Sequence, residues 1–471
     1  MNAGPVAASR PAQRNERSST PIMTPAILLS CLFCEIPPAT PPPVPLEPLP
    51  SPQQLAWHEL EYGMFCHFGV NTFLDQEWGD GQEDPDVFQP RDFDPQQWVR
   101  AAKDAGMRYL VFTAKHHDGF CLFPSSLTAH SVAASSWRDG KGDVVRDVAE
   151  ACRTAGLMFG VYLSPWDRHE PAYSDPPAYD EYFKGQLREL LTRYGPVGEV
   201  WLDGAGGKGH VYDWEGYFSL VRELQPNALL AICGPDIRWV GNEDGLAPDT
   251  VWYVQERGGK PVWYPPECDV PIRKGHWFFH ADSEDTVRSV DELLEIYYRS
   301  VGRGAGLLLN ITPDRRGLLP EKDVSVVREM WRIIAETFRT NLAQDKPACA
   351  DHVRGGDPAY GPDKAVDGLP DTYWTTDEDV TAAALEVDLG APTRFNRSMI
   401  QEYLPLGQRV EAYAIDAWDG GEWRQVVAGT TVGHKRLDRF PDVTAARVRL
   451  TVEKAKACPA IRTFGVYCAP E

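Results

Sequence analysis

A carboxylate directly follows an apolar run in the segment EVWLDGA, where Asp203 stands just after a short predicted strand. A second carboxylate, Glu243, follows the apolar pair of GPDIRWVGNE. Two such groups can cleave a glycosidic bond, because one attacks or stabilises the anomeric carbon while the other protonates the departing oxygen. An isolated Asp-Gly pair is equally typical of a plain turn. The surrounding sequence has to decide whether Asp203 forms a turn or does chemistry.

Histidines and aromatic residues follow other apolar runs of the chain. His67 follows the first run and is succeeded by Glu77 and Trp78, and the adjacent His116 and His117 follow the second. A neutral imidazole offers one hydrogen-bond donor and one acceptor, which suits a sugar hydroxyl, and indole rings suit the apolar faces of a sugar. Since adjacent strand residues point to opposite sides, we expect one histidine of the pair in a pocket and the other behind it.

Four more residues are candidates for the walls of this pocket. Tyr162 lies near the end of the run FGVYLS, Trp201 lies in EVWLD, and Arg273 and Trp277 stand in CDVPIRKGHWFFH. Trp201, Arg273 and Trp277 fit a core or scaffold position equally well. The acidic segment 80–86 is interpreted as a solvated surface loop without a chemical role.

The elements that must position these residues alternate along the chain. Eight candidate strands begin at residues 64, 109, 159, 199, 229, 251, 276 and 306. Amphipathic helical patterns lie between many of them, over residues 95–105, 143–155, 179–194, 214–225 and 287–301. This alternation predicts a (β/α)8 barrel of the α/β class, although residues 235–249 show no helical pattern. Because barrel strands share one rim at their carboxyl ends, the candidate residues should surround one pocket.

The chain length of 471 residues exceeds what one core usually supports, so we expect more than one domain. Residues 1–52 are predicted to be a disordered or Pro-rich leader that ends in an extended tether, and residues 53–344 the barrel, closed by a helix over 331–343. Residues 345–471 show period-two alternation and Gly-containing turns. That pattern predicts a C-terminal β-sandwich of the jelly-roll type.

Ordered motifs over residues 54–340 make this chain similar to the glycoside hydrolase family 29 α-L-fucosidases; among them are FCHFGVNTF, EWGDG, AKHHDGFCLFPS, YLSPWDRHE, EVWLDGA and SVGRGAGLLLN. HFGVNTF and GPDIRWVGNE resemble the branch that releases α-1,3- and α-1,4-linked fucose from Lewis-type glycans. KAVDGLPDTYWTT resembles discoidin-like carbohydrate-binding modules. The resemblance implies an exo-acting, retaining enzyme with a fucosylated oligosaccharide or glycoconjugate as its substrate.

The resemblance also implies residue roles. Asp203 matches the nucleophile and Glu243 the acid/base, while Glu267 and Glu256 compete for the second role because its position varies in the family. Residues 67, 116 and 117 match histidines that bind fucose hydroxyls, with Glu77 and Trp78 closing the pocket. Whether Asp367, Trp374 and Thr375 of the sandwich bind sugar or fix a loop stays open. The rival from another class is a fucose-binding, lectin-like protein on an inactive barrel.

Composition argues against several other classes of function. The charge of 47 − 68 = −21 would repel nucleic acids and anionic lipids, and no apolar stretch approaches the length of a membrane span. No metal or cofactor is expected, because the first strand offers HFG rather than two histidines separated by one residue, and the cysteines lack zinc spacing. A metal-dependent hydrolase is therefore the weaker enzyme hypothesis.

The sequence leaves the compartment and the oligomeric state open. An apolar run after Met23 is similar to a short secretion signal, but a disordered leader, and with it the cytoplasm, is slightly favoured. Cys349, Cys458 and Cys468 are candidates for a disulfide if the protein is exported.

Overall fold

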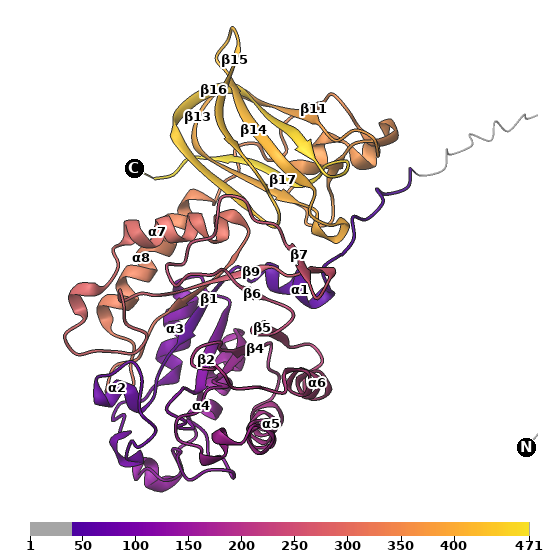
Figure 1. The fold of residues 1–471 in the computed structure, drawn as a ribbon. Coiled ribbons are helices and arrows are strands. Elements are labelled where there is room, and N and C mark those ends of the chain that lie inside the picture. Colours follow the sequence, from indigo (N-terminus) through magenta and orange to yellow (C-terminus); the bar gives the residue numbers. More distant parts are fainter. Residues whose placement is uncertain (1–39, 471) are drawn as a thin grey trace, which may run out of the picture. The chain divides into compact units, whose positions relative to one another are not determined.

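Eight parallel strands form the first sheet of the computed structural model, which describes residues 40–470 (Figure 1). The strand order is β5-β4-β3-β2-β1-β10-β9-β6. The two outer strands meet through a bridge between Ala231 and Ile237, so the sheet closes into a barrel. The bounds are β1 Tyr62–Cys66, β2 Tyr109–Lys115, β3 Met158–Leu163, β4 Glu199–Leu202, β5 Leu229–Ile232, β6 Arg238–Trp239, β9 Pro266–Pro271 and β10 Gly306–Asn310.

Helices follow most of the early strands and cover the outside of the barrel (Figure 1). Side-chain caps define several of their starts, because Asp94 and Asp143 accept hydrogen bonds from the first turns of α3 and α4. Gly156 ends α4 in the left-handed conformation, which glycine adopts without strain. The bounds are α1 Pro52–His58, α2 Val70–Leu74, α3 Pro95–Asp104, α4 Val144–Ala155, α5 Pro176–Arg193, α6 Trp214–Leu224, α7 Val290–Arg299 and α8 Glu321–Thr337.

Two of the eight predicted barrel strands are wrong. The run at 251 leads into β7 (Val254–Arg257), which pairs only with β8 (Lys260–Trp263) in an antiparallel hairpin, and the run at 276 is a loop. Val251 and Tyr253 are buried against the C-terminal domain, which explains why the run at 251 is apolar although it is not a barrel strand. Their places in the barrel are taken by β6 and β9.

The predicted helices are confirmed to within a few residues, apart from the closing one. The helix expected over 331–343 begins ten positions earlier, at Glu321, and ends at Thr337. Residues 235–249 contain β6 and loops but no helix, in agreement with their sequence.

The C-terminal domain is an antiparallel β-sandwich, so the predicted architecture of a barrel followed by a sandwich is confirmed. Its two longest strands span 20 residues each and pair with each other, with shifts of register that mark β-bulges. A separate apolar core that includes Trp374 lies inside. The bounds are β11 Ala348–Ala350, β12 Trp374–Thr375, β13 Ala383–Glu402, β14 Val410–Trp418, β15 Trp423–Gly429, β16 Arg436–Ala455 and β17 Ala460–Tyr467.

The segment before the barrel differs from the expected free tether where the structure describes it. Its backbone bonds to the sandwich, since Arg354 donates to the carbonyl oxygens of Pro41 and Pro42, and Arg409 donates to that of Val44. The signal sequence considered at Met23 lies outside the described residues.

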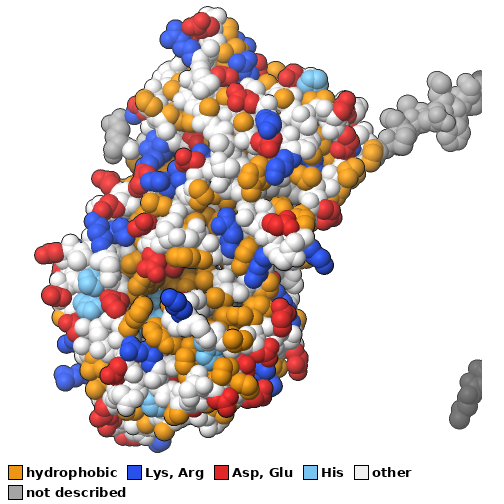
Figure 2. Space-filling view, viewed as in Figure 1, with side chains coloured by type: hydrophobic (Ala, Val, Ile, Leu, Met, Phe, Trp, Pro, Cys, Tyr) orange, Lys and Arg blue, Asp and Glu red, His pale blue; other side chains and the backbone are white. Residues whose placement is uncertain are grey.

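Two further sequence expectations concern a disulfide and membrane-spanning segments. All cysteines within residues 40–470 are free thiols, so the disulfide considered for the sandwich is not present there. No helix in this range is long and apolar enough to cross a membrane. Acidic and basic side chains are interspersed over the face drawn in Figure 2.

Candidate active site

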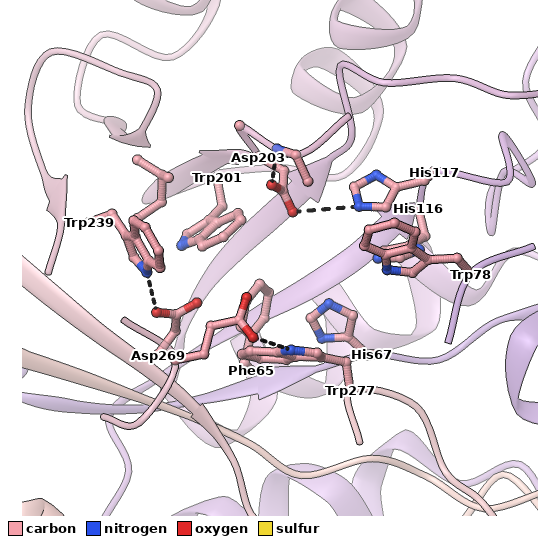
Figure 3. A pocket seen from close by; sticks show the side chains of 14 residues that line it. Phe65, His67, Trp78, His116, His117, Trp201, Asp203, Trp239, Asp269 and Trp277 are labelled. Carbon is pink, nitrogen blue, oxygen red and sulfur yellow. Dashed lines mark hydrogen bonds and ion pairs between the residues drawn. The ribbon is translucent and has the colours of Figure 1, made fainter. Parts of the chain in front are cut away.

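A cavity of about 420 Å³ lies at the rim where the carboxyl ends of the barrel strands meet (Figure 3). Its volume falls within the range of small-molecule sites, roughly 300–1,000 Å³. The lining side chains are aromatic, imidazole and carboxyl groups; the residues are Phe65, His67, Trp78, His116, His117, Trp201, Asp203, Gly204, Ala205, Ile232, Trp239, Glu243, Asp269 and Trp277. Loops that are far apart in sequence therefore contribute to one pocket, as the barrel topology predicted.

Asp203 lies just beyond β4, where its carboxylate both closes a turn and lines the cavity. One carboxylate oxygen accepts from the backbone N–H of Ala205 at 2.7 Å, which closes an Asx turn. The other accepts from the Tyr162 hydroxyl at 2.9 Å and lies 3.9 Å from Nε2 of His117. Burial raises the pKa of Asp203, and the two donated hydrogen bonds oppose that rise. The side chain remains open to the cavity.

Glu243 follows β6 and reaches the same cavity from an exposed loop. Its Oε2 accepts from the indole N–H of Trp277 at 3.0 Å. Trp277 also lines the cavity, and it lies on the loop after β9. A carboxyl group that is fixed by one donor and is open to water can exchange protons with the solvent.

The three candidate histidines all line the cavity. Burial lowers the pKa of His67 and of His117 to about 3 and that of His116 well below its usual range, so the rings are neutral near pH 7. Nδ1 of His67 lies 3.0 Å from Oδ1 of Asn310, an acceptor, so this nitrogen carries the proton and Nε2 accepts. The expectation that only one of the adjacent pair would reach the pocket is wrong, since both do.

Trp78 and Trp201 line the cavity, whereas Tyr162 supports it from behind. The Tyr162 ring stacks on Trp201 with centroids 5.3 Å apart and donates to Asp203. Trp78 lies at the rim with 54% of its surface exposed. Glu77, the neighbour of Trp78, is not among the lining residues.

The Glu77 carboxylate instead contacts four polar groups of the loop after β9. One oxygen takes the backbone N–H groups of Trp277 and Phe278, at 2.9 and 3.2 Å. The other lies 3.2 Å from Nδ1 of His276 and 2.7 Å from Nε2 of His280. Glu77 therefore holds the loop that carries Trp277.

Arg273 does not belong to the pocket and takes the scaffold position that the sequence left equally open. Its guanidinium is 3% exposed and makes two hydrogen bonds of 2.9 and 3.0 Å to Asp323 of α8. The sequence suggested a binding residue because Arg273 stands near an aromatic cluster, but its partner lies 50 positions away. The pair joins the end of β9 to the closing helix.

Neither competing glutamate reaches the cavity. Glu256 is exposed on the β7–β8 hairpin. Glu267 points into the barrel interior, where it accepts from the Tyr109 hydroxyl at 2.9 Å and the Trp201 indole at 3.1 Å. Burial raises the pKa of Glu267 to about 7. In the acidic segment 80–86, the polar side chains are exposed as expected except for Glu83, which is buried and accepts from backbone N–H groups there.

Asp269 is a third carboxyl group of the cavity that sequence reasoning missed. It is 4% exposed and accepts from the Trp239 indole at 2.7 Å (Figure 3). Burial raises its pKa to about 8, so the group is protonated near pH 7. One sequence signal could have indicated Asp269: it stands two positions after Glu267, and residues i and i+2 of a strand point to the same face. The segment PPECDVP, however, resembles a loop more than a strand.

Comparison with known proteins identifies the family to which this chain belongs. The family profile "Alpha-L-fucosidase" matches residues 45–335, and that of the "F5/8 type C domain" matches residues 349–463. Alpha-L-fucosidase 1 of Arabidopsis thaliana is 42% identical over 91% of this chain and 89% of its own length.

Solved structures show the same likeness over both domains. The Ruminococcus gnavus GH29 fucosidase in complex with fucose has a TM-score of 0.86 at 32% identity, covering 92% of this chain and 97% of its own. A glycoside hydrolase 29 family member from an unknown rumen bacterium has a TM-score of 0.79 at 38% identity, covering 91% and 78%. This chain therefore belongs to the α-L-fucosidases of glycoside hydrolase family 29 and carries a C-terminal F5/8 type C domain.

Proposed function

We propose that this α-L-fucosidase is an exo-acting, retaining enzyme that removes α-1,3- and α-1,4-linked fucose from Lewis-type glycans, with Asp203 as nucleophile and Glu243 as acid and base. The observation that carries the proposal is that both carboxyl groups line one cavity of sugar-binding size. The histidines beside them are neutral, so they can bind hydroxyl groups without adding charge.

The reaction proceeds in two displacements. In the first, the ionised carboxylate of Asp203 bonds to the anomeric carbon as the bond to the leaving sugar breaks, and Glu243 gives its proton to the departing oxygen. In the second, the Glu243 carboxylate takes a proton from water, the water oxygen bonds to the same carbon, and the ester to Asp203 breaks. Two inversions at one carbon retain its configuration.

The surroundings of each carboxyl group suit its role. The hydroxyl of Tyr162 and the N–H of Ala205 stabilise the ionised form of Asp203, which is the form that attacks. Glu243 lies on an exposed loop, where it can receive and release protons, while Trp277 fixes its carboxylate. Each oxygen of the nucleophile therefore has a partner before the substrate binds.

The rim supports the proposed preference for branched glycans. Trp239 and Trp78 are 41% and 54% exposed beside the cavity, so two indole faces are available to the sugars next to the scissile bond. The sequence forms HFGVNTF and GPDIRWVGNE resemble those of the α-1,3/1,4 branch.

A substrate panel tests the linkage. Purified protein is incubated with Lewis-type trisaccharides that carry α-1,3- or α-1,4-fucose, with an α-1,2-fucosyl disaccharide and with an aryl α-L-fucoside. We expect the branched trisaccharides to have the highest kcat/KM. Equal or faster release from the α-1,2 linkage would contradict the proposed specificity, although not the fucosidase activity.

A pair of variants tests the acid/base. Glu243→Gln should lower kcat/KM on a trisaccharide by roughly 10²–10⁴-fold, the usual contribution of general acid catalysis. A dinitrophenyl fucoside needs no such proton, so the first displacement on it should be much less affected. Glu256→Gln, on the exposed hairpin, is the matched control. Normal trisaccharide cleavage by Glu243→Gln would exclude Glu243 from the role.

A further inference from the structure

Two histidines and a glutamate converge beside the cavity without lining it. Nδ1 of His276 and Nε2 of His280 lie 3.2 and 2.7 Å from the same oxygen of Glu77. Among the residues that the structure describes, these three are the one group of His, Cys, Asp or Glu side chains whose ligand atoms all lie within 4.8 Å of one another. They come from two loops, one after α2 and one after β9, so folding alone brings them together.

The outer contacts of the group resemble those of a metal site. The second oxygen of Glu77 is held by the backbone N–H groups of Trp277 and Phe278, which leaves the first oxygen aimed at the imidazoles. The second nitrogen of His280 lies 3.4 Å from a carboxylate oxygen of Asp75. A carboxylate that binds the far nitrogen of a ligating histidine is the usual way in which proteins orient such a ligand.

We propose that Glu77, His276 and His280 bind a divalent transition-metal ion, with zinc the best match. Two imidazole nitrogens and one carboxylate oxygen form a donor set that zinc accepts, with water in the fourth position. Tetrahedral bonds of about 2.0–2.1 Å place ligand atoms about 3.3 Å apart, so small rotations suffice. The side chains are partly exposed, at 31%, 28% and 13%, and a hollow lined by Glu77 and Gly275 gives access.

The proposed ion differs from the catalytic metal that the sequence argued against. It would connect the loop of Trp78 to the loop of Trp277, two walls of the cavity, and would take no part in bond breaking. The sequence pattern did not indicate His276 and His280 as ligands, because the run at 276 was expected to be a strand, whereas it is a loop.

Cobalt spectroscopy on the intact protein tests the site without using catalysis, so the result is independent of the proposed fucosidase specificity. Chelator-treated protein is titrated with Co²⁺, and we expect visible d–d bands of tetrahedral intensity that saturate at one ion per chain and disappear on adding Zn²⁺. His280→Gln should lose the bands, and His352→Gln, an exposed histidine of the sandwich, should keep them.

Two further measurements protect the test against a misfolded variant. Asp75→Asn leaves all three ligands and should weaken Zn²⁺ binding by roughly 10–100-fold. Zinc at about 100 times its Kd should raise the Tm of the wild-type protein by about 3 °C, and this rise should be absent in His280→Gln. Absence of d–d bands in the wild type, or equal binding by His280→Gln, would overturn the proposal.

Discussion

The hydrogen bond from Tyr162 to Asp203 should set the acidic limb of the enzyme's pH profile. The bond is 2.9 Å long, and the Tyr162 ring is fully buried against Trp201. A hydrogen bond to a charged group is worth about 1.5–3 kcal/mol, and one pKa unit corresponds to about 1.4 kcal/mol. Tyr162→Phe keeps the ring and removes only the donor, so the pKa of Asp203 should rise further, by about 1–2 units.

The direction in which the acidic limb moves follows from the protonation state in which Asp203 reacts. Asp203 attacks as a carboxylate, so a higher pKa moves the acidic limb of kcat/KM to higher pH and leaves activity above the limb nearly unchanged. The assay is kcat/KM on an aryl α-L-fucoside against pH. Tyr179→Phe is the control, because that buried hydroxyl donates only to the carbonyl oxygen of Pro165. An unshifted limb, with kcat/KM lowered equally at every pH, would show that this hydrogen bond does not set the pKa of Asp203.

Three other substitutions test residues around the cavity and in the barrel scaffold. Trp277→Phe removes the hydrogen-bond donor to Glu243 and should lower kcat/KM about tenfold on a trisaccharide but less on an aryl fucoside. Equal losses on both substrates would contradict the idea that Trp277 positions the Glu243 carboxyl group. Asp269 keeps its proton up to about pH 8 in the native protein, whereas the unfolded chain releases it near pH 4. Between these two pH values, the unfolding free energy of the wild type should therefore fall by about 1.4 kcal/mol per pH unit relative to that of Asp269→Asn, as measured by urea unfolding. A pH-independent difference would refute the raised pKa. Arg273→Met leaves Asp323 buried without its partner and should cost about 3–5 kcal/mol of unfolding free energy with KM unchanged; a raised KM would return Arg273 to the pocket.

The barrel and its rim could be predicted because their signals are local. Apolar runs mark most of the strands, and parallel strands with helical crossovers have one arrangement that brings their carboxyl ends together. Asp203, Glu243 and the three histidines all reach the cavity, as that topology predicts. Their roles in the reaction remain proposals.

The parts that could not be predicted depend on partners far away in the sequence. The apolar run that contains Tyr253 is covered by the sandwich and is not a barrel strand. Arg273 is buried because Asp323 pairs with it. The strand β9 was missed because its inward side chains, Glu267 and Asp269, are acidic. The indole N–H groups of Trp201 and Trp239 donate to these two carboxyl groups, and a sequence pattern does not show which tryptophans will do so.

The stereochemistry of the first product distinguishes double from single displacement. Proton NMR follows a Lewis-type trisaccharide during cleavage and records which anomer of free fucose accumulates before mutarotation. Double displacement through Asp203 predicts that α-fucose forms first. If β-fucose forms first, a single displacement by water is operating, and Asp203 is not the nucleophile.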